Sequence, residues 1–99
     1  MQSFGELIRK TRAEKGMLLR ELADKIQMDQ GLLSKIERGE RMPTREQVIL
    51  FSKIFKTNQD DLLILYLSDK LIYELQDEKL GGKALKVAEQ KFKYIKKYY

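Results

Sequence analysis

The chain has 99 residues, of which 42% are hydrophobic and 35% charged, and it contains neither cysteine nor histidine. This length corresponds to one domain with a small core, and the missing residue types exclude disulfides, zinc fingers and histidine-based catalysis. The longest apolar run, Leu62 to Leu67, has six residues, whereas a membrane span needs about 20. The first residues also lack the apolar stretch of a signal peptide, so we expect a cytoplasmic protein.

The charge is distributed unevenly along the chain, and its net value of +5 is by itself only a weak sign of an anionic partner. Residues 1–57 carry 12 Lys/Arg against 8 Asp/Glu, residues 58–82 carry 2 against 6, and residues 83–99 carry 6 against 1. The basic, acidic and basic blocks therefore indicate different roles for three parts of the chain.

The apolar residues recur at helical spacing, and the chain has one proline, Pro43, and no alternating strand pattern. An all-α fold is therefore expected. The first helix is predicted to begin after Ser3, which would form a capping box with Glu6, and to end at Gly16.

Two short helices joined by a tight turn are predicted next. One covers about Leu18 to Gln27, and the other runs from its N-cap, Asp29, to Gly39. Such a pair is the helix-turn-helix arrangement.

The fourth helix is predicted to begin at Thr44, which forms a capping box with Gln47. Five of its apolar residues are expected to face inward: Val48, Leu50, Phe51, Ile54 and Phe55. Asn58 caps the fifth helix, whose pattern continues to about Asp77. The spacing permits either one long helix or two helices joined near Ser68.

Gly81 and Gly82 are predicted to break the chain before a last helix from about Lys83 to Lys97. Its apolar residues fall on one side and five of its six lysines on the other. The apolar side comprises Leu85, Ala88, Phe92, Ile95 and Tyr99.

The helix-turn-helix segment also carries an ordered motif: Leu22-Ala23, then Leu33-Ser34-Lys35-Ile36-Glu37-Arg38-Gly39, then Pro43. This motif resembles the Cro and phage-repressor helix-turn-helix family, also called the xenobiotic-response-element type, over roughly residues 4–67. The resemblance implies a five-helix, repressor-like DNA-binding domain in residues 1–67. Residues 68–99 would then be a C-terminal helical extension.

In this family, the second helix of the motif enters the major groove and its first side chains meet base edges. The resemblance implies five base-contacting residues: Gln30, Gly31, Leu32, Ser34 and Lys35. Gln30 is suited to adenine, Lys35 to guanine and Leu32 to a thymine methyl group. The alternatives are core packing for Leu32 and an ordinary solvated helix surface for Gln30 and Lys35.

The resemblance also implies roles for other charged residues. Arg38, Arg41 and Arg45 surround the loop after the second motif helix, where such residues contact phosphates; each alone is equally consistent with a solvated charge. Arg12 and Glu37 resemble a buried ion pair of the family, the alternative being two independent surface charges.

Three positions depart from the family pattern. Leu18 and Leu19 stand where members commonly carry Ser and Gln, which removes a polar cap and a phosphate contact. Gln27 stands at a turn position that is often Gly, so it must adopt a left-handed conformation. Leu18 and Met17 would form either an exposed apolar patch for a protein partner or simple packing under the first helix.

A five-helix DNA-binding domain of this type contacts one half-site, and such domains usually act as two-fold dimers on a near-palindrome. We therefore expect residues 68–99 to form the dimerisation element. Its candidate residues are Leu71, Ile72, Leu75, Leu85, Phe92 and Ile95. A purely intramolecular extension of the core is the alternative.

These features predict a sequence-specific DNA-binding transcription regulator that binds double-stranded DNA as a homodimer. It would act as a repressor or autoregulator, for example a restriction–modification controller, an antitoxin or a phage-type repressor. The alternative is an interaction module that keeps the fold but neutralises or bridges a partner protein. The sequence shows neither a phosphate-binding glycine loop nor a second domain that would form a catalytic cleft, so an enzyme is not expected. No cofactor, metal or small-molecule ligand is expected either.

Overall fold

The computed structural model describes residues 2–98, with the backbone alone at Tyr98. These residues form six α-helices and no strand, which confirms the predicted all-α fold. The helices are α1 (Phe4–Glu14), α2 (Leu19–Ile26), α3 (Gln30–Glu37), α4 (Arg45–Phe55), α5 (Gln59–Leu75) and α6 (Gly81–Tyr98). Tyr99, expected on the apolar side of the last helix, lies outside the described residues.

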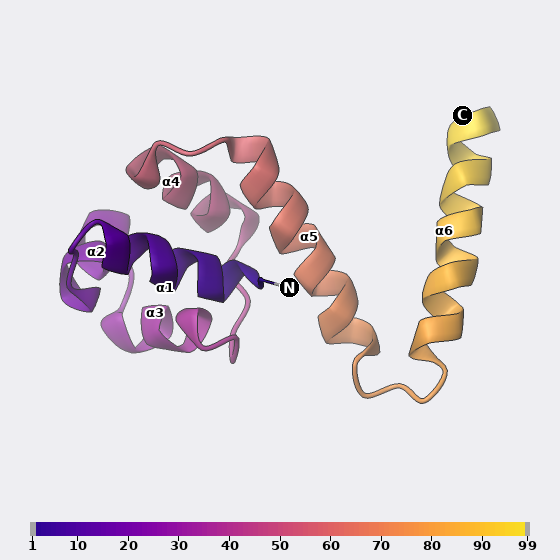
Figure 1. Ribbon diagram of the computed structural model, residues 1–99, viewed down its shortest axis with the longest axis horizontal. Coiled ribbons are helices and arrows are strands. Elements are labelled where there is room, and N and C mark those ends of the chain that lie inside the picture. Colours follow the sequence, from indigo (N-terminus) through magenta and orange to yellow (C-terminus); the bar gives the residue numbers. More distant parts are fainter. Residues whose placement is uncertain (1, 99) are drawn as a thin grey trace.

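The core lies among α1 to α5, whereas α6 stands apart from them (Figure 1). All five helices contribute buried apolar side chains, which are excluded from water and thereby stabilise the fold. Phe4 joins three of them, because its ring meets Phe51 of α4 edge-on at 5.7 Å and Tyr66 of α5 at 6.5 Å. The largest fully buried side chains are Phe4, Phe51, Ile8, Leu22, Leu33, Ile36 and Val48.

The predicted helix starts are confirmed by side-chain caps. The cap oxygens accept hydrogen bonds from backbone amides three residues on, at Ser3, Asp29, Thr44 and Asn58. Thr44 and Gln47 complete their capping box, since Gln47 Oε1 also accepts from Thr44 N at 2.9 Å. At α1, by contrast, Phe4 N donates to Asp69 Oδ2 at 2.7 Å. A residue 65 positions away thus satisfies the amide of the first residue of α1, while the Ser3 hydroxyl forms the expected half of the capping box.

The start and end of α2 follow from the unusual residues there. Leu18 at the N-cap has no side-chain acceptor, and only Glu21 Oε1 accepts from its amide, at 3.4 Å. Gln27 ends the helix in the predicted left-handed conformation, at φ 55° and ψ 49°. Leu18 is 51% exposed, whereas Met17 packs against the core, so the expected patch is reduced to Leu18.

Two expectations about α4 and α5 are decided by the structure. The prediction that Leu50 faces inward is wrong: it is 42% exposed, because Val48, Phe51 and Phe55 define the buried side of α4 and Leu50 lies on the other side. The segment after Asn58 is one continuous helix, α5, and not two helices joined near Ser68. The expected division between residues 67 and 68 therefore falls inside α5.

The prediction that Gly81 and Gly82 break the chain is wrong. The break is the turn formed by residues 76–80, and α6 already begins at Gly81. Gly81 is needed for close packing, because a Cβ there would lie 2.6 Å from the carbonyl oxygen of Leu75. Within residues 2–98, none of the helices combines the length and hydropathy that a membrane span requires.

Candidate DNA-binding surface

Helix α3 has a buried side and an exposed side. Leu33, Ile36 and Glu37 are buried against the rest of the domain. Four of the expected base-contacting residues share the other side, because they form two pairs with a four-residue spacing. The pairs are Gln30 with Ser34 and Gly31 with Lys35. This side is the part of α3 that is available to a groove of DNA.

The five residues expected to contact bases do not all occupy equivalent positions. Gln30, Gly31 and Lys35 are exposed, and Ser34 is half-buried. Leu32 is also half-buried but packs against the hydrophobic core, as its alternative interpretation required. The structure therefore brings four of the five residues onto one exposed side and leaves Leu32 at its edge.

Arg38 extends this side at the end of α3. Its Nη1 donates to Ser34 Oγ at 2.9 Å, and its Nη2 lies 2.8 Å from Glu40 Oε2. The hydrogen bond from Arg38 and its positive charge lower the pKa of the exposed Glu40 carboxyl. Glu40 thus partly neutralises the Arg38 guanidinium and would compete with another anion for it.

The other two arginines lie farther along the same segment. Arg41 is exposed in the loop between α3 and α4, and Arg45 is exposed at the first residue of α4. Among the described residues, no ion pair involves either guanidinium. Both are therefore positioned to contact an anion without first losing an acidic partner.

Arg12 and Glu37 are brought together in a two-pronged ion pair. Arg12 Nε and Nη2 donate to the two carboxylate oxygens of Glu37 at 2.8 and 3.0 Å, and Nη1 donates to Met17 O at 2.9 Å. Glu37 is 7% exposed. Its hydrogen bonds and charge raise the pKa of Arg12, against the opposing effect of burial. The pair fixes α3 to α1 with a geometry that two parallel hydrogen bonds define.

A pocket of about 240 Å³ opens beside this ion pair, between α1, α2 and α3. It is lined by Arg9, Arg12, Leu19, Ser34, Glu37 and Arg38. Arg9 was not singled out from the sequence, although it precedes Arg12 by three residues and therefore shares its side of α1. The pocket adds a further cation near the exposed side of α3.

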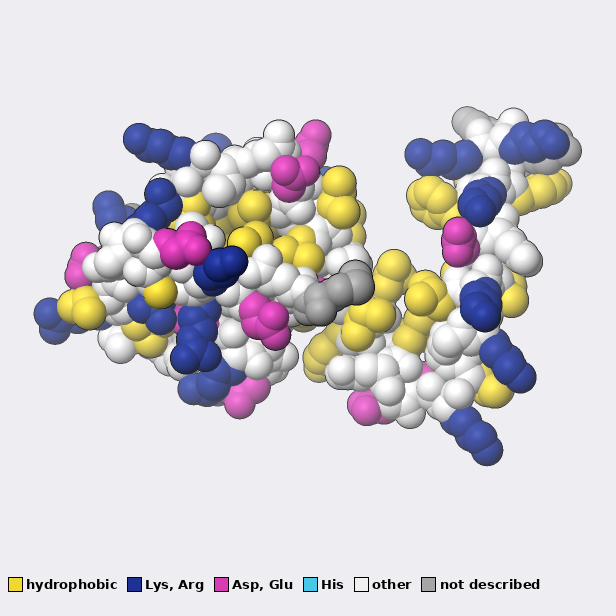
Figure 2. All heavy atoms as spheres, viewed as in Figure 1, with side chains coloured by type: hydrophobic (Ala, Val, Ile, Leu, Met, Phe, Trp, Pro, Cys, Tyr) yellow, Lys and Arg dark blue, Asp and Glu magenta, His cyan; other side chains and the backbone are white. Residues whose placement is uncertain are grey.

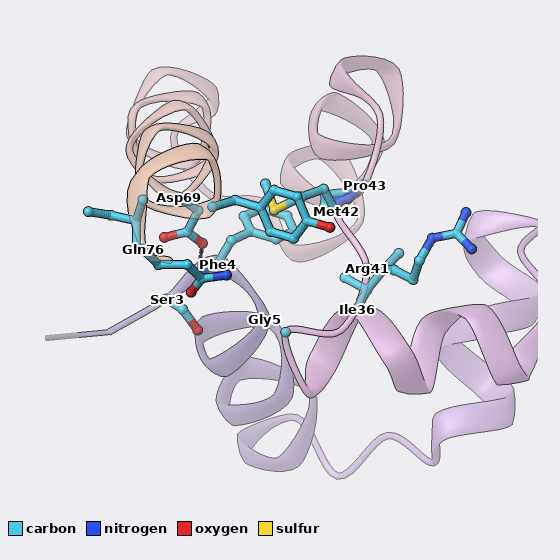
Figure 3. Close-up of a pocket in the computed structure, with 12 residues that line it drawn as sticks. Ser3, Phe4, Gly5, Ile36, Arg41, Met42, Pro43, Asp69 and Gln76 are labelled. Atoms are coloured by element: carbon cyan, nitrogen blue, oxygen red, sulfur yellow. Dashed lines mark hydrogen bonds between the residues drawn. The ribbon is translucent and has the colours of Figure 1, made fainter. Parts of the chain in front are cut away.

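A second pocket, of about 160 Å³, lies where α5 leaves the domain (Figure 3). The Asp69 carboxylate points to the amide of Phe4, and the Arg41 side chain extends away from these two residues. Ile72, Tyr73 and Gln76 of α5 also line this pocket. It therefore marks the junction between the five-helix domain and the end of α5.

The six candidate dimerisation residues do not join the core. Leu71, Ile72, Leu85, Phe92 and Ile95 are exposed, and Leu75 is half-buried. Sequence reasoning missed two further exposed residues on α5, Ile64 and Leu67. Their position in the longest apolar run favoured burial, but only one side of α5 faces the core.

Within residues 2–98, no three acidic side chains lie close enough together to hold a metal ion.

Comparisons with known proteins agree with this geometry. The family model described as helix-turn-helix matches residues 8–62, while no curated protein sequence gives a significant match. The crystal structure of the clp gene regulator ClgR from Corynebacterium glutamicum is 26% identical, with a TM-score of 0.57, and the match covers 96% of this chain and 87% of ClgR. SinR, in the SinR protein/SinI protein complex, is 25% identical with a TM-score of 0.56, over 95% of this chain and 98% of that one. The chain therefore belongs to the Cro/C1-type helix-turn-helix family of DNA-binding transcription regulators.

Proposed function

We propose that this chain is a cytoplasmic, sequence-specific repressor that regulates its own gene or a neighbouring one, as a restriction–modification controller does. Residues 1–67 would read DNA, and residues 68–99 would join two copies on a near-palindromic operator. The observation that carries the proposal is the exposed polar side of α3, which the core and the Arg12–Glu37 pair hold in place.

The side chains on α3 suit direct readout of the major groove. The Gln30 amide can donate to and accept from adenine, and the Lys35 ammonium can donate to O6 and N7 of guanine. A good two-pronged contact contributes about 1–3 kcal/mol of discrimination against a wrong base. Ser34 is suited to a base or a phosphate, and Leu32 to a thymine methyl group at the edge of the contact.

The arginines around α3 supply the part of the binding that is independent of base sequence. Arg38, Arg41 and Arg45 would contact phosphates and set the register of α3 in the groove. Each phosphate contact releases counterions, so the affinity should fall steeply as the salt concentration rises. The basic charge of residues 1–57 supports this surface as the side that faces DNA.

A protein-interaction module is the second candidate. It is favoured by the exposed Leu18 at the start of α2, where a polar cap and a phosphate contact are missing. The similar SinR protein is found in a complex with the SinI protein. In this alternative, the chain would neutralise or bridge a partner protein, and α3 would read no DNA.

A titration with labelled duplex from the gene's own upstream region distinguishes these candidates. The wild type and the Gln30→Ala/Lys35→Ala variant are measured with excess random competitor at two salt concentrations. The matched control is Gln59→Ala/Lys53→Ala, which removes the same two residue types from exposed positions on α5 and α4. We expect salt-sensitive binding that resists competitor, is lost in the α3 variant and is kept in the control.

Weak binding that is equal on random DNA, and unchanged in the α3 variant, would contradict sequence-specific readout and favour the interaction module. A promoter–reporter assay with the same three proteins then tests the sign of regulation. Repression is expected for the wild type and the control, and activation by the wild type would contradict the repressor assignment.

A further inference from the structure

Helix α5 has two apolar sides, only one of which is covered. Leu62, Leu63 and Tyr66 are buried in the core. On the opposite side, Ile64, Leu67, Leu71 and Leu75 follow each other at intervals of three or four residues, which places them in one row. We call these four residues the outer stripe. Its first member, Ile64, is 65% exposed, and a helix that is apolar on both sides normally has both covered.

Helix α6 carries a second row with the same kind of spacing, formed by Leu85, Ala88, Phe92 and Ile95. The large residues of this row are exposed, Phe92 by 63%. Figure 1 shows that α6 runs at a distance from the other helices, and Figure 2 shows hydrophobic side chains gathered between the end of α5 and α6. Within residues 2–98, the far part of this row, at Phe92 and Ile95, is therefore not covered by another helix.

The turn between the two helices is closed by local backbone hydrogen bonds. Gln76 N donates to Ile72 O, Glu78 N donates to Leu75 O, and Gly81 N donates to Glu78 O, at 2.8 to 3.0 Å. Gly81 also packs directly on the carbonyl of Leu75. In the structure, α6 leaves this turn in an open position, in which it does not cover the outer stripe of its own chain.

Two positions of each row coincide when the helices run antiparallel. Counted from Glu78, the middle of the turn, Leu71 and Leu85 are each seven residues away, and Ile64 and Phe92 are each fourteen away. A seven-residue repeat returns to the same side of a helix, as in coiled coils. The helices have 17 and 18 residues, or about 26 Å at 1.5 Å per residue, so the two helices also agree in length.

The net charges of the two segments favour packing of α5 on α6. At equal distance from Glu78, Asp60 at the start of α5 corresponds to Lys96 near the end of α6, and Lys96 Nζ borders the apolar row 5.5 Å from the ring centre of Phe92. Residues 58–82 are net acidic and residues 83–99 net basic. Packing α5 on α5, or α6 on α6, would bring like charges together, whereas packing α5 on α6 brings opposite charges together.

We propose that two copies exchange their last helices, so that α6 of each copy packs antiparallel on the outer stripe of α5 in the other. The inference rests on the homodimer of the proposed function and names its interface. Exchange between identical chains repeats both contacts by two-fold symmetry. Since the outer stripe begins at Ile64, next to the core residues of α5, the interface directly sets the spacing of the two α3 helices.

The mass of the full-length protein in solution tests the interface. We expect the wild type to have twice its chain mass of 11.7 kDa, and the Leu71→Asp/Phe92→Asp variant to have the mass of one chain. The control, Leu18→Asp/Leu50→Asp, changes two exposed residues of comparable accessibility outside the rows and should remain dimeric. Helical circular dichroism should be unchanged in both variants, because all four residues lie outside the core. A wild type that is monomeric at micromolar concentration would overturn the proposal.

Cysteine crosslinking distinguishes exchange from closure of α6 onto its own α5. The chain has no cysteine, so the Leu71→Cys/Leu85→Cys variant introduces the only two thiols. Under mild oxidation, exchange predicts a covalent dimer, whereas an internally crosslinked monomer would overturn it. Leu50→Cys/Leu85→Cys is the control pair and should crosslink much more slowly.

DNA titrations separate failure of this inference from failure of the proposed function. A wild type that is monomeric but binds DNA in a salt-sensitive, α3-dependent manner contradicts only the exchanged interface. A wild type that is dimeric and crosslinks between chains, but binds no DNA, supports the interface and contradicts the DNA-reading role.

Discussion

The five-helix domain and the segment after it use apolar residues at the same helical spacing, yet their side chains have opposite surroundings. In α1 to α5, one row on each helix meets the others around Phe4 and Phe51. On the outer side of α5 and on α6, equivalent rows are exposed. The spacing therefore determines where a helix forms and which side is apolar, whereas the arrangement of the chain determines whether that side is covered.

Matched phenylalanine substitutions should give the largest contrast between the two regions. Phe51 is fully buried and Phe92 is 63% exposed. Phe51→Ala should lower the free energy of unfolding by about 3–5 kcal/mol, because it removes buried apolar atoms and leaves a cavity. Phe92→Ala should change it by less than about 0.5 kcal/mol at concentrations where the chain is monomeric. Urea denaturation checks both values, and equal losses would contradict the division into two regions.

Breaking the Arg12–Glu37 pair should give the second-largest loss of stability, because the pair joins α1 to α3 inside the domain. Glu37→Ala leaves the Arg12 guanidinium, whose side chain is 18% exposed, without its carboxylate. We expect a loss of about 3 kcal/mol in unfolding free energy, together with weaker DNA binding as α3 loosens. Thermal and urea denaturation measure the effect. The exposed Glu46→Ala serves as control, and a Glu37 variant as stable as this control would contradict the structural role.

Asp69 tests the junction of the two regions. Asp69→Ala removes the acceptor for Phe4 N and should cost about 1–2 kcal/mol of stability, as expected for a lost cap or a charge-assisted hydrogen bond. Asp77→Ala, at an exposed position in the turn, should be nearly neutral. Amide hydrogen exchange at the start of α1 should accelerate in the first variant alone. Unchanged protection there would show that Asp69 does not hold α1 to α5.

The substitution of Glu40 should give the smallest effect, a modest change in DNA affinity. Glu40→Gln removes the acidic partner of Arg38, so a carboxylate no longer competes with phosphate for the guanidinium. DNA affinity should rise less than about tenfold, since exposed ion pairs are weak, with a slightly steeper salt dependence. Fluorescence anisotropy at several salt concentrations, beside Glu46→Gln as control, measures this change. A decrease in affinity would contradict competition between Glu40 and DNA.

Local features of this fold were predictable from the sequence because their causes are local. The caps at Asp29 and Asn58 depend on amides three residues away. The left-handed Gln27 was expected from the family resemblance, because members often carry Gly at this turn position, and the structure confirms it. The Arg12–Glu37 contact joins distant residues, and only the family resemblance pointed to it. The polar side of α3 followed from the same resemblance, since the spacing alone does not distinguish a DNA-reading helix from a solvated one.

The features that were missed depend on how distant segments pack. The bond between Asp69 and Phe4 joins residues 65 positions apart, and no local pattern marks it. Gly81 resembles a chain break in sequence, whereas its contact with Leu75 gives it a packing role at the start of α6. Ile64 and Leu67 look like core residues within an apolar run, and only the orientation of α5 shows that they face outward.

Hydroxyl-radical footprinting on the upstream duplex tests most directly the claim that two copies read DNA through α3. The wild type should protect two patches of backbone separated by one helical turn, about 10 base pairs, or a multiple of it. Gln30→Ala/Lys35→Ala should abolish both patches, and Leu71→Asp/Phe92→Asp should reduce them to weak, independent half-site binding. A wild-type footprint with a single patch, or with uniform protection that the α3 variant retains, would contradict the account.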